Sequence, residues 1–217
     1  MVKKQIVVVG LGRFGTSLVR TLVEAGHEVL ALDKDLRKVE DASEFATQAA
    51  QVDATDEDAL REMGVRNFDI AVVAIGTDIK SSILVTLLLK KVGVRMVVSK
   101  AQDDLHGEIL GRVGADRVVY PERETGIRVA HSLMTPSLVD YLEVMPGYGI
   151  AKLVAPPDFV GRELAEIDLK GRFGVTTLAL RRGNEIILNP IRSEVVGRDN
   201  VLIIAGKDEQ LEAMRTS

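Results

Sequence analysis

The sequence predicts an α/β protein in which a doubly wound parallel sheet precedes a small α+β domain. Over the first half of the chain, short β-branched runs alternate with longer stretches of helical period, a pattern typical of a parallel sheet covered by helices. A glycine-rich turn joins the first run to the first helical stretch. Beyond residue 138 the pattern changes to short apolar runs separated by Pro and Gly. We therefore expect two domains, at residues 1–138 and 139–217.

The first domain is expected to alternate strands with helices. The predicted strands cover residues 5–9, 28–33, 47–52, 69–75, 95–100 and 117–120. The predicted helices cover residues 14–24, 37–44, 57–63, 79–92, 105–113 and 122–134. Asp56 and Asp78 stand where helix N-caps belong, and a glycine follows the last apolar position of four helices, where the chain needs a left-handed φ. These glycines are Gly26, Gly64, Gly93 and Gly114.

The second domain is expected to be built from short strands and hairpins. The predicted strands cover residues 142–145, 150–155, 175–180, 185–188 and 201–205, with short helices at 160–165 and 209–214. Pro146-Gly147 and Gly183-Asn184 mark turns between these runs. Because Pro136 breaks the helix before it, we place the domain boundary near residues 136–142.

Composition excludes several classes of protein. Of the 217 residues, 46% are hydrophobic and 28% charged, which argues against disorder and coiled coil. A formal net charge of −4 gives no electrostatic footprint for nucleic acid. The absence of cysteine excludes disulfides, thiol catalysis and thiolate metal sites, and it is compatible with a reducing compartment. Because no apolar run reaches about eighteen residues, we expect neither a membrane helix nor a signal peptide, so any membrane role would require a partner protein.

The turn after the first strand has the form Gly-x-Gly-x-x-Gly, at Gly10, Gly12 and Gly15. Gly10 permits the tight turn, Gly12 lets backbone approach a pyrophosphate, and Gly15 packs helix on strand. Asp33 ends the second strand, where a carboxylate accepts the hydroxyls of an adenosine ribose and repels the 2′-phosphate of NADP. These features predict a Rossmann-like nucleotide site. The alternative is that the glycines only tighten a turn and that Asp33 only caps the next helix.

Arg13 and Phe14 lie inside this glycine turn. The position of Arg13 is more often apolar or small in hydride-transferring dehydrogenases. A cation there can reach a terminal phosphate, which favours ATP or ADP as well as, or instead of, a dinucleotide. The alternative is an ordinary surface arginine.

Further predicted site residues lie at the carboxyl ends of the second, third and fourth strands, beside the switch point of the sheet, where adenine and ribose bind. They are Lys34, Asp53, Ala54, Thr55, Ala74, Ile75 and Gly76. A helix cap at residues 53–55 and a tight turn at residues 74–76 are the alternatives for these two segments.

The pattern of catalytic residue types argues against an enzyme. A dehydrogenase needs a general acid or base, usually His, beside its substrate. His27, His106 and His131 are widely spaced, and the sequence has no His cluster or Asp-x-Asp loop for a metal. We therefore expect a chain that binds a nucleotide without transforming it. The alternative function is an NAD-dependent oxidoreductase whose catalytic residues are not recognised.

The motifs together resemble a known family. Residues 7–15, 31–33, 68–76, 100–102 and 114–118 are similar to the RCK domain, the regulator of conductance of potassium. Residues 169–175 and 200–206 resemble the C-terminal half of the same family, although Lys170 and Asn200 replace its usual arginine and aspartate. The resemblance spans nearly the whole chain. It is closest to cytosolic subunits of Ktr-type and Trk-type (KtrA/TrkA-type) bacterial potassium uptake systems.

The resemblance implies a regulatory subunit that binds ATP or ADP, with NAD(H) as a further ligand linked to related members. It implies homodimers assembled into an octameric ring beneath a membrane potassium channel subunit, and hence a cytoplasmic, peripheral location on the inner face of the cell membrane. ATP would favour the conducting form and ADP the closed form. Some relatives also bind cyclic di-AMP through the C-terminal domain.

The resemblance also assigns roles within the site. Arg13 would meet terminal phosphates across the dimer contact, and Asp33 would hold the ribose. Residues 53–55 and 74–76 would flank the adenine. Lys100 would lie near the phosphates, and Glu122 would bind a divalent cation, Mg²⁺ or Ca²⁺, that bridges two ATP sites.

Overall fold

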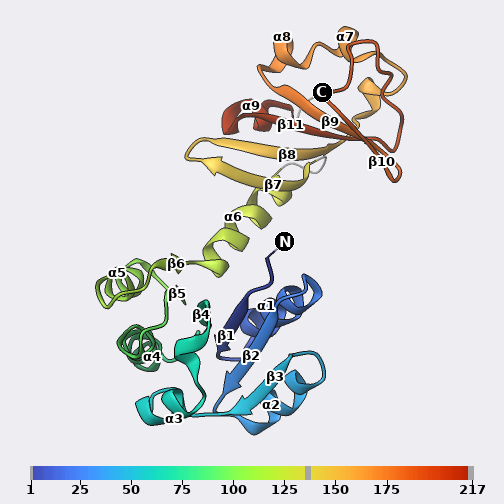
Figure 1. Cartoon of the computed structure of the whole chain (residues 1–217). Coiled ribbons are helices and arrows are strands. Elements are labelled where there is room, and N and C mark those ends of the chain that lie inside the picture. Colours follow the sequence, from blue (N-terminus) through green and yellow to red (C-terminus); the bar gives the residue numbers. More distant parts are fainter. Residues whose placement is uncertain (1, 135–137, 215–217) are drawn as a thin grey trace. The chain divides into compact units, whose positions relative to one another are not determined.

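The structure, a computed structural model, describes residues 2–134 and 138–214 (Figure 1). Its contacts divide the chain into two compact units, Met1–Glu122 and Arg123–Ser217. Helix α6 (Pro121–Met134) falls mostly in the second unit by this division, whereas the predicted boundary at residue 138 assigns it to the first domain. Pro136, on which that boundary depends, lies outside the described residues. The position of the boundary therefore stays a prediction.

A parallel sheet forms the centre of the first unit. Its strands are β1 (Gln5–Val9), β2 (Glu28–Asp33), β3 (Gln48–Gln51), β4 (Ile70–Val73), β5 (Met96–Lys100) and β6 (Arg117–Val119). They lie in the order β3-β2-β1-β4-β5-β6, with every neighbouring pair parallel. Because the chain crosses from β3 at one edge to β4 on the other side of β1, the sheet has a switch point between β1 and β4. The predicted doubly wound, Rossmann-like sheet is confirmed.

Helices between the strands start and end within one residue of the predicted bounds. They are α1 (Arg13–Glu24), α2 (Leu36–Ser43), α3 (Glu57–Glu62), α4 (Ile79–Val92) and α5 (Asp104–Arg112), with a 3-10 turn η1 (Val65–Asn67) after α3. Asp56 and Asp78 cap α3 and α4 by accepting hydrogen bonds from N–H groups of the first turn. The predicted helix-ending glycines all have positive φ, from 67° at Gly64 to 110° at Gly114.

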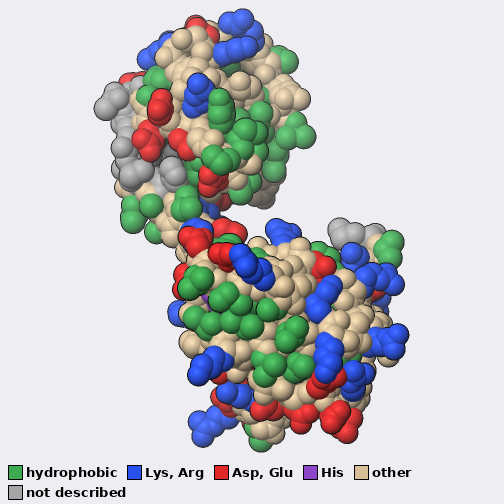
Figure 2. Space-filling model, turned by 90° about the vertical axis from the view of Figure 1, so that its left-hand side faces the viewer, with side chains coloured by type: hydrophobic (Ala, Val, Ile, Leu, Met, Phe, Trp, Pro, Cys, Tyr) green, Lys and Arg blue, Asp and Glu red, His purple; other side chains and the backbone are tan. Residues whose placement is uncertain are grey.

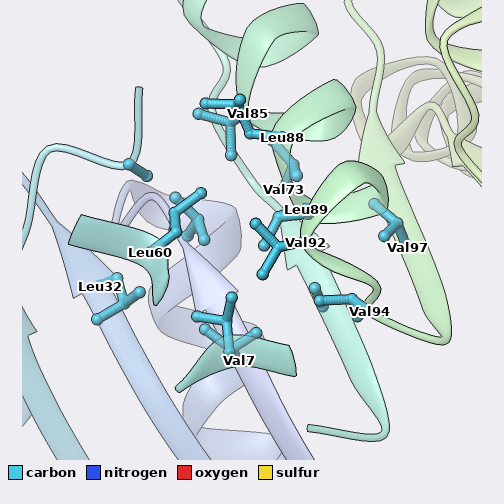
Figure 3. Close-up of a cluster of buried hydrophobic side chains, with 14 of the residues drawn as sticks. Val7, Leu32, Leu60, Val73, Val85, Leu88, Leu89, Val92, Val94 and Val97 are labelled. Carbon is cyan, nitrogen blue, oxygen red and sulfur yellow. The ribbon is translucent and has the colours of Figure 1, made fainter. Parts of the chain in front are cut away.

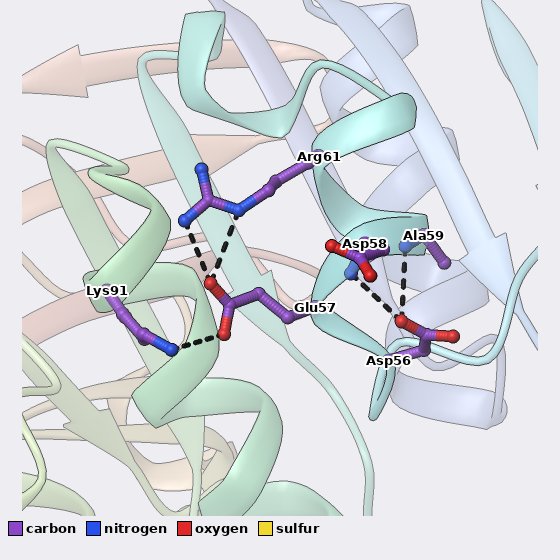
Figure 4. Close-up of polar contacts among 6 residues, drawn as sticks. All are labelled: Asp56, Glu57, Asp58, Ala59, Arg61 and Lys91. Atoms are coloured by element: carbon purple, nitrogen blue, oxygen red, sulfur yellow. Dashed lines mark hydrogen bonds and ion pairs between the residues drawn. The ribbon is translucent and has the colours of Figure 1, made fainter.

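One carboxylate fastens α3 to α4 (Figure 4). Glu57 accepts hydrogen bonds from Arg61 Nη2 at 2.8 Å and from Lys91 Nζ at 2.5 Å. These bonds, that of Lys91 first, lower the pKa of Glu57. Asp56 accepts the N–H of Asp58 in the same turn. Two neighbouring carboxylates, those of Asp56 and Glu57, therefore hold the start of α3 in place.

The sheet of the first unit is buried on both faces. On one face, Val7 and Leu32 belong to a cluster with Leu89 of α4 (Figure 3). On the opposite face, Ile6 and Val8 belong to a cluster that includes residues of α1 and α2. Successive side chains of a strand point to opposite faces, and a parallel sheet covered on both sides therefore needs continuous apolar strands. This requirement explains the uninterrupted β-branched run of β1.

The second unit contains an antiparallel sheet. Its strands are β7 (Leu138–Met145), β8 (Tyr148–Val154), β9 (Thr176–Arg182), β10 (Glu185–Leu188) and β11 (Val201–Lys207), in the order β10-β9-β11-β8-β7. The helical segments are η2 (Pro157–Phe159), α7 (Leu164–Ile167), α8 (Leu169–Phe173) and α9 (Asp208–Ala213). This arrangement confirms the predicted small α+β unit. Among the described residues, no helix combines the length and the apolar character needed to cross a membrane.

The helix predicted at residues 160–165 is wrong. Gly161 has φ +83°, outside the helical region, and its N–H donates to the carbonyl of Val196 at 2.8 Å. Glu163 forms an isolated antiparallel bridge with Val195, so a turn at residues 160–161 and this bridge precede α7, which begins only at Leu164. The apolar spacing of this stretch suits a helix, but its backbone groups pair across the unit instead.

Candidate nucleotide-binding site

A cavity of about 480 Å³ lies at the carboxyl ends of the parallel strands, beside the switch point. This volume is within the range of small-molecule sites. Every predicted site residue except Gly15 lines the cavity, including the glycine turn, Asp33, the two strand-end segments, Lys100 and Glu122. The structure thus brings together residues that the sequence separates by more than a hundred positions.

The glycine turn leaves the start of α1 open toward the cavity. Gly10 has φ +98°, and a Cβ on it would lie 3.0 Å from the backbone at Ala74 and Ile75. A Cβ on Gly12 would meet no atom within 4 Å, so the backbone there is free to approach a ligand. A Cβ on Gly15 would lie 1.9 Å from the carbonyl oxygen of Gly10, so Gly15 holds the helix against the turn and does not face the cavity.

The N-terminus of α1 has the features of an anion site. No side chain caps it, since Gly12 is the N-cap, and its first turn holds no acidic residue. The N–H groups of that turn and the positive end of the helix dipole therefore favour a negatively charged group at this point. The charged groups around the rest of the cavity determine which anion would fit.

Asp33 is a fixed carboxylate at the end of β2. It is only 7% exposed, and its Oδ2 accepts the N–H of Leu11 at 2.7 Å while its Oδ1 accepts the N–H of Asp35 at 2.9 Å. The side chain that caps α2 is Asp35, which accepts the N–H of Arg37 at 3.0 Å. The alternative in which Asp33 only caps the next helix is therefore wrong. Instead, Asp33 ties the glycine turn to β2 and still has lone pairs for a ligand.

Two cations line the part of the cavity at the start of α1 and the end of β5, Arg13 and Lys100. Lys100 is nearly buried, forms an ion pair with Glu122 and lies 5.8 Å from the centroid of the Phe14 ring. The hydrogen bond from Lys100 is the largest cause of the lowered pKa of Glu122, and the charge of Arg13 adds to it. Lys100 also lies against Gly76, where an added Cβ would be 3.0 Å from its Nζ. A phosphate at this end would face two positive side chains.

The segments that follow β3 and β4 form the remaining walls. Asp53 accepts hydrogen bonds from the N–H and the Oγ1 of Thr55, at 3.0 and 2.6 Å, and these bonds lower its pKa. Asp53 is therefore a turn residue, because the cap of α3 is Asp56. Ala54 and Ala74 are almost fully buried and present small apolar surfaces beside which a flat base could lie.

Sequence reasoning missed several residues that line the cavity: Val9, Lys38, Val52, Thr77, Asp78, Ser81 and Val85. The apolar members carried no distinguishing signal, because they continue the hydrophobic strands and helices. Lys38 had a usable signal, since it stands five positions after Asp33 in the first turns of the following helix. Its Nζ lies 3.5 Å from Asp33 Oδ2.

His27 and His106 do not line the cavity. His27 accepts the N–H of Lys4 through Nδ1 at 3.3 Å, and His106 accepts the N–H of Gln102 at 3.2 Å. Burial lowers the pKa of His106. The side chain of His131 lies outside the described part of the structure. Across residues 2–134 and 138–214, no three His, Cys, Asp or Glu side chains group as a metal site.

Known domain families match the sequences of both units. The TrkA-N domain family matches residues 6–121, and the TrkA-C domain family matches residues 150–217. The Ktr system potassium uptake protein C of Bacillus subtilis (strain 168) is 41% identical over 204 residues, which cover 94% of this chain and 92% of that protein. The Ktr system potassium uptake protein A of the same organism is 35% identical over 209 residues, covering 96% of this chain and 94% of that one.

Comparison with solved structures supports the fold of the first unit and of the chain as a whole. The GsuK RCK domain matches with a TM-score of 0.68 at 19% identity, over 99% of this chain and 47% of that one, so this chain spans about half its length. The NAD(P)-binding domain of an exopolyphosphatase-related protein from Archaeoglobus fulgidus matches with a TM-score of 0.52 at 25% identity, over 58% of this chain and 93% of that one. With both domain families matched and 41% identity over nearly its full length, the chain belongs to the TrkA-N and TrkA-C family of the Ktr potassium uptake proteins, as the sequence motifs predict.

Proposed function

We propose that this chain is the nucleotide-binding regulatory subunit of a Ktr-type potassium uptake system. The observation that carries the proposal is the cavity at the switch point, where Asp33 and the cations Arg13 and Lys100 line one pocket. The 41% identity to a Ktr system potassium uptake protein supports the role in potassium transport. The membrane channel itself would be a separate subunit, whose ion flux this chain controls.

The proposed ligands are ATP and ADP, with NAD(H) as a further ligand. The GsuK channel, whose fold this chain shares at 18% and 17% identity, is solved bound to NAD and also bound to ADP, which supports both kinds of ligand. Asp33 would accept the ribose hydroxyls, residues 53–55 and 74–76 would flank the adenine, and the start of α1 would receive the phosphates. Lys34 would add a cation beside the ribose.

Gating requires a ligand that favours one conformation over another by differential contacts. ATP and ADP share every contact at the ribose and the base, so only the terminal phosphate can distinguish them. Arg13, exposed beside the glycine turn, is the residue placed to make that contact, from its own chain or across a dimer. A difference of one charge-assisted hydrogen bond, about 1.5–3 kcal/mol, shifts a two-state equilibrium by about ten- to a hundredfold.

The proposed assembly is a homodimer that builds an octameric ring, held at the inner face of the membrane by its channel partner. An apolar patch on the first unit supports a contact between copies. Leu84 and Leu87 of α4 and Leu105 of α5 are 40%, 45% and 69% exposed. Figure 2 shows hydrophobic side chains gathered on the face of the first unit (the lower body) that carries these helices. Exposed apolar patches of this kind mark protein interaction sites.

The residues of one copy do not by themselves fit a divalent cation. Glu122 is engaged by Lys100, and among the described residues it belongs to no group of three or more His, Cys, Asp or Glu side chains that could hold a metal ion. A cation at Glu122 would need oxygen ligands from a nucleotide phosphate or from a second copy. The proposed cation therefore depends on ligand and assembly together.

Cyclic di-AMP is the proposed ligand of the second unit. A pocket of about 260 Å³ there is lined by Lys170 and Arg192, together with Asp168, two threonines and apolar residues. The two cations would suit the phosphates of a cyclic dinucleotide. The pocket supports the proposal by its charge alone.

Calorimetric titration of the purified chain with ATP, ADP and NADH tests the proposal. We expect ATP and ADP to bind, and light scattering with each nucleotide to give particles larger than a monomer. A chain that binds neither nucleotide, or that stays monomeric with both, would overturn the proposal. Incubation with NADH and a panel of carbonyl compounds tests the oxidoreductase alternative, and steady oxidation of NADH would favour that alternative.

A further inference from the structure

Lys38 stands next to the carboxylate that the proposed function assigns to the ribose. Its Nζ lies 3.5 Å from Asp33 Oδ2, and both residues line the cavity. The Lys38 side chain is 45% exposed, whereas the Asp33 side chain is 8% exposed. Among the described residues, no other cation forms an ion pair with Asp33. Lys38 is therefore the charged donor that a sugar at Asp33 would meet.

The distance between Lys38 and Asp33 is longer than that of a closed hydrogen bond. A hydrogen bond from an ammonium to a carboxylate spans about 2.7–2.9 Å. At 3.5 Å the ammonium is close enough to offset the charge of Asp33, yet its donors are not committed to it. A hydroxyl group inserted beside this pair would find an acceptor on one side and a donor on the other.

The hydrogen-bonding capacity of Asp33 makes a second residue necessary. The backbone N–H groups of Leu11 and Asp35 already use one lone pair on each oxygen, so Asp33 can accept from both ribose hydroxyls but can donate nothing. Each hydroxyl oxygen then keeps lone pairs that need a donor, and a half-buried polar atom without a partner weakens binding. An ammonium group supplies three donors.

Lys34 and Lys38, two of the three lysines that line the cavity, differ in their charged neighbours. Lys38 follows the N-cap Asp35 by three positions, and Val39 beside it is buried, which fixes the rotation of α2. The pKa values of Asp53 and Asp78 are lowered first by hydrogen bonds from Thr55 and Ser81, and the charge of Lys34 adds to both shifts. Among the described residues, Lys38 is the lysine that forms an ion pair with Asp33.

From this geometry we infer that Lys38 is a specificity-determining residue. It donates a hydrogen bond to the oxygen of a ribose hydroxyl, while Asp33 accepts a hydrogen bond from the same hydroxyl. The inference rests on the proposed nucleotide function and adds a second residue to sugar recognition. It makes the site selective for ribonucleotides over nucleotides that lack the ribose hydroxyls.

A cycle of two proteins and two ligands tests the inference. Calorimetry would measure the affinities of the parent chain and of Lys38→Met for ADP and for 2′,3′-dideoxy-ADP. We expect Lys38→Met to weaken ADP roughly fivefold and to leave dideoxy-ADP nearly unchanged, because a single exposed hydrogen bond is lost. An equal loss for both ligands would overturn the inference, since Lys38 would then act only through its charge.

Matched variants distinguish a hydrogen bond donated by Lys38 and a general effect of positive charge. Arg37→Met removes the same charge from an exposed neighbour that does not line the cavity, and it should leave the ratio of the two affinities unchanged. Lys38→Arg keeps the charge but changes the donor geometry, so partial loss of selectivity is expected. Tighter binding of NADP than of NAD by the parent would overturn the inference in favour of a 2′-phosphate contact.

Failure of the inference and failure of the proposed function are distinguishable. If the parent chain binds ADP but has the same ratio of ADP affinity to dideoxy-ADP affinity as Lys38→Met, the inferred role of Lys38 is refuted and the proposed function is not. A parent chain that binds no adenine nucleotide refutes the proposed function, and the inference with it. Thermal unfolding of each variant checks that the fold is retained.

Discussion

The proposed ribose end of the cavity, around Asp33, and its proposed phosphate end, around Arg13, Lys100 and Glu122, hold their charges in different ways. At the ribose end, Asp33 is nearly buried, and two backbone N–H groups fix its oxygens. At the phosphate end, Arg13 and Glu122 are exposed, and the buried Lys100 is paired with Glu122. A carboxylate held by backbone keeps its position with or without a ligand, whereas exposed side chains exchange partners readily.

Because of this difference, the two ends of the proposed site should have different roles in nucleotide binding. A preorganised group contributes affinity because little conformational freedom is lost on binding. The ribose end should therefore bind all adenine ribonucleotides alike. The phosphate end, with its adjustable cations, should distinguish ligands by their number of phosphates. Each of the following substitutions tests one side of this division.

Asp33→Ala should have the largest effect, and the effect should be the same for both nucleotides. Removal of the carboxylate takes away the acceptor for two ribose hydroxyls, each worth about 1.5–3 kcal/mol to a charged group, so binding of ATP and of ADP should weaken by about a hundredfold or more. Calorimetry measures both losses. Unequal losses for ATP and ADP would contradict the division between the two ends.

Two controls accompany this variant. Asp33→Asn keeps one oxygen that can accept the N–H of Leu11, and it therefore separates loss of ribose contacts from loosening of the glycine turn. Asp41→Ala removes a carboxylate from an exposed position of α2 and should leave both affinities unchanged. A thermal unfolding curve for each variant shows whether the fold survives.

The ribose end is also the part that the sequence predicts best. Asp33 lies at the end of a regular strand, and the glycine turn precedes a regular helix, so local pattern alone brings them to one edge of the sheet. The pairing of Lys100 with Glu122 could not be predicted in the same way, because it joins the end of β5 to the start of α6, 22 positions further along the chain. Side-chain pairs across elements depend on packing that periodicity does not encode.

The same limit explains the errors in the second unit. The strands from β8 to β11 alternate in the predicted manner, since period and turn residues are local signals. Residues 160–165 carry a local helical signal that tertiary pairing with residues 194–196 overrides. Lys38 is a different case, because its place five positions after Asp33, in the first turn of a predicted helix, is a local signal that the sequence reasoning did not use.

Arg13→Ala should weaken ATP more than ADP. The proposed function assigns the guanidinium to a terminal phosphate, so we expect a loss of about tenfold for ATP and less than about threefold for ADP by calorimetry. The exposed Arg95 offers a matched control, since Arg95→Ala removes the same charge from outside the cavity. Equal loss for ATP and ADP would refute the phosphate role of Arg13.

Glu122→Gln should have a smaller effect on nucleotide affinity than Arg13→Ala. In the absence of a divalent cation it should strengthen binding rather than weaken it. Removing the carboxylate frees Lys100 for the phosphates and relieves repulsion, so ADP should bind about two- to threefold more tightly in a buffer with chelator. With Mg²⁺ or Ca²⁺ present, the variant should lose any cation-dependent increase in the melting temperature of the ATP complex. Unchanged melting temperatures with and without the cation, in the parent as in the variant, would count against the proposed metal role. Glu124→Gln, at an exposed position of α6, is the control.

The pH dependence of this variant sharpens the test. The pKa of Glu122 is lowered from 4.5, first by the hydrogen bond from Lys100, so the carboxylate is ionised at every pH above that value. The ion pair is therefore fully present above pH 4.5 and is lost only as the pH falls through the lowered pKa. We expect the ratio of ADP affinities between Glu122→Gln and the parent to be constant from about pH 8 to about pH 6. If this ratio approached one within that interval, a group other than Glu122 would cause the difference in ADP affinity. The Lys100–Glu122 ion pair would then not be what weakens ADP binding at the phosphate end.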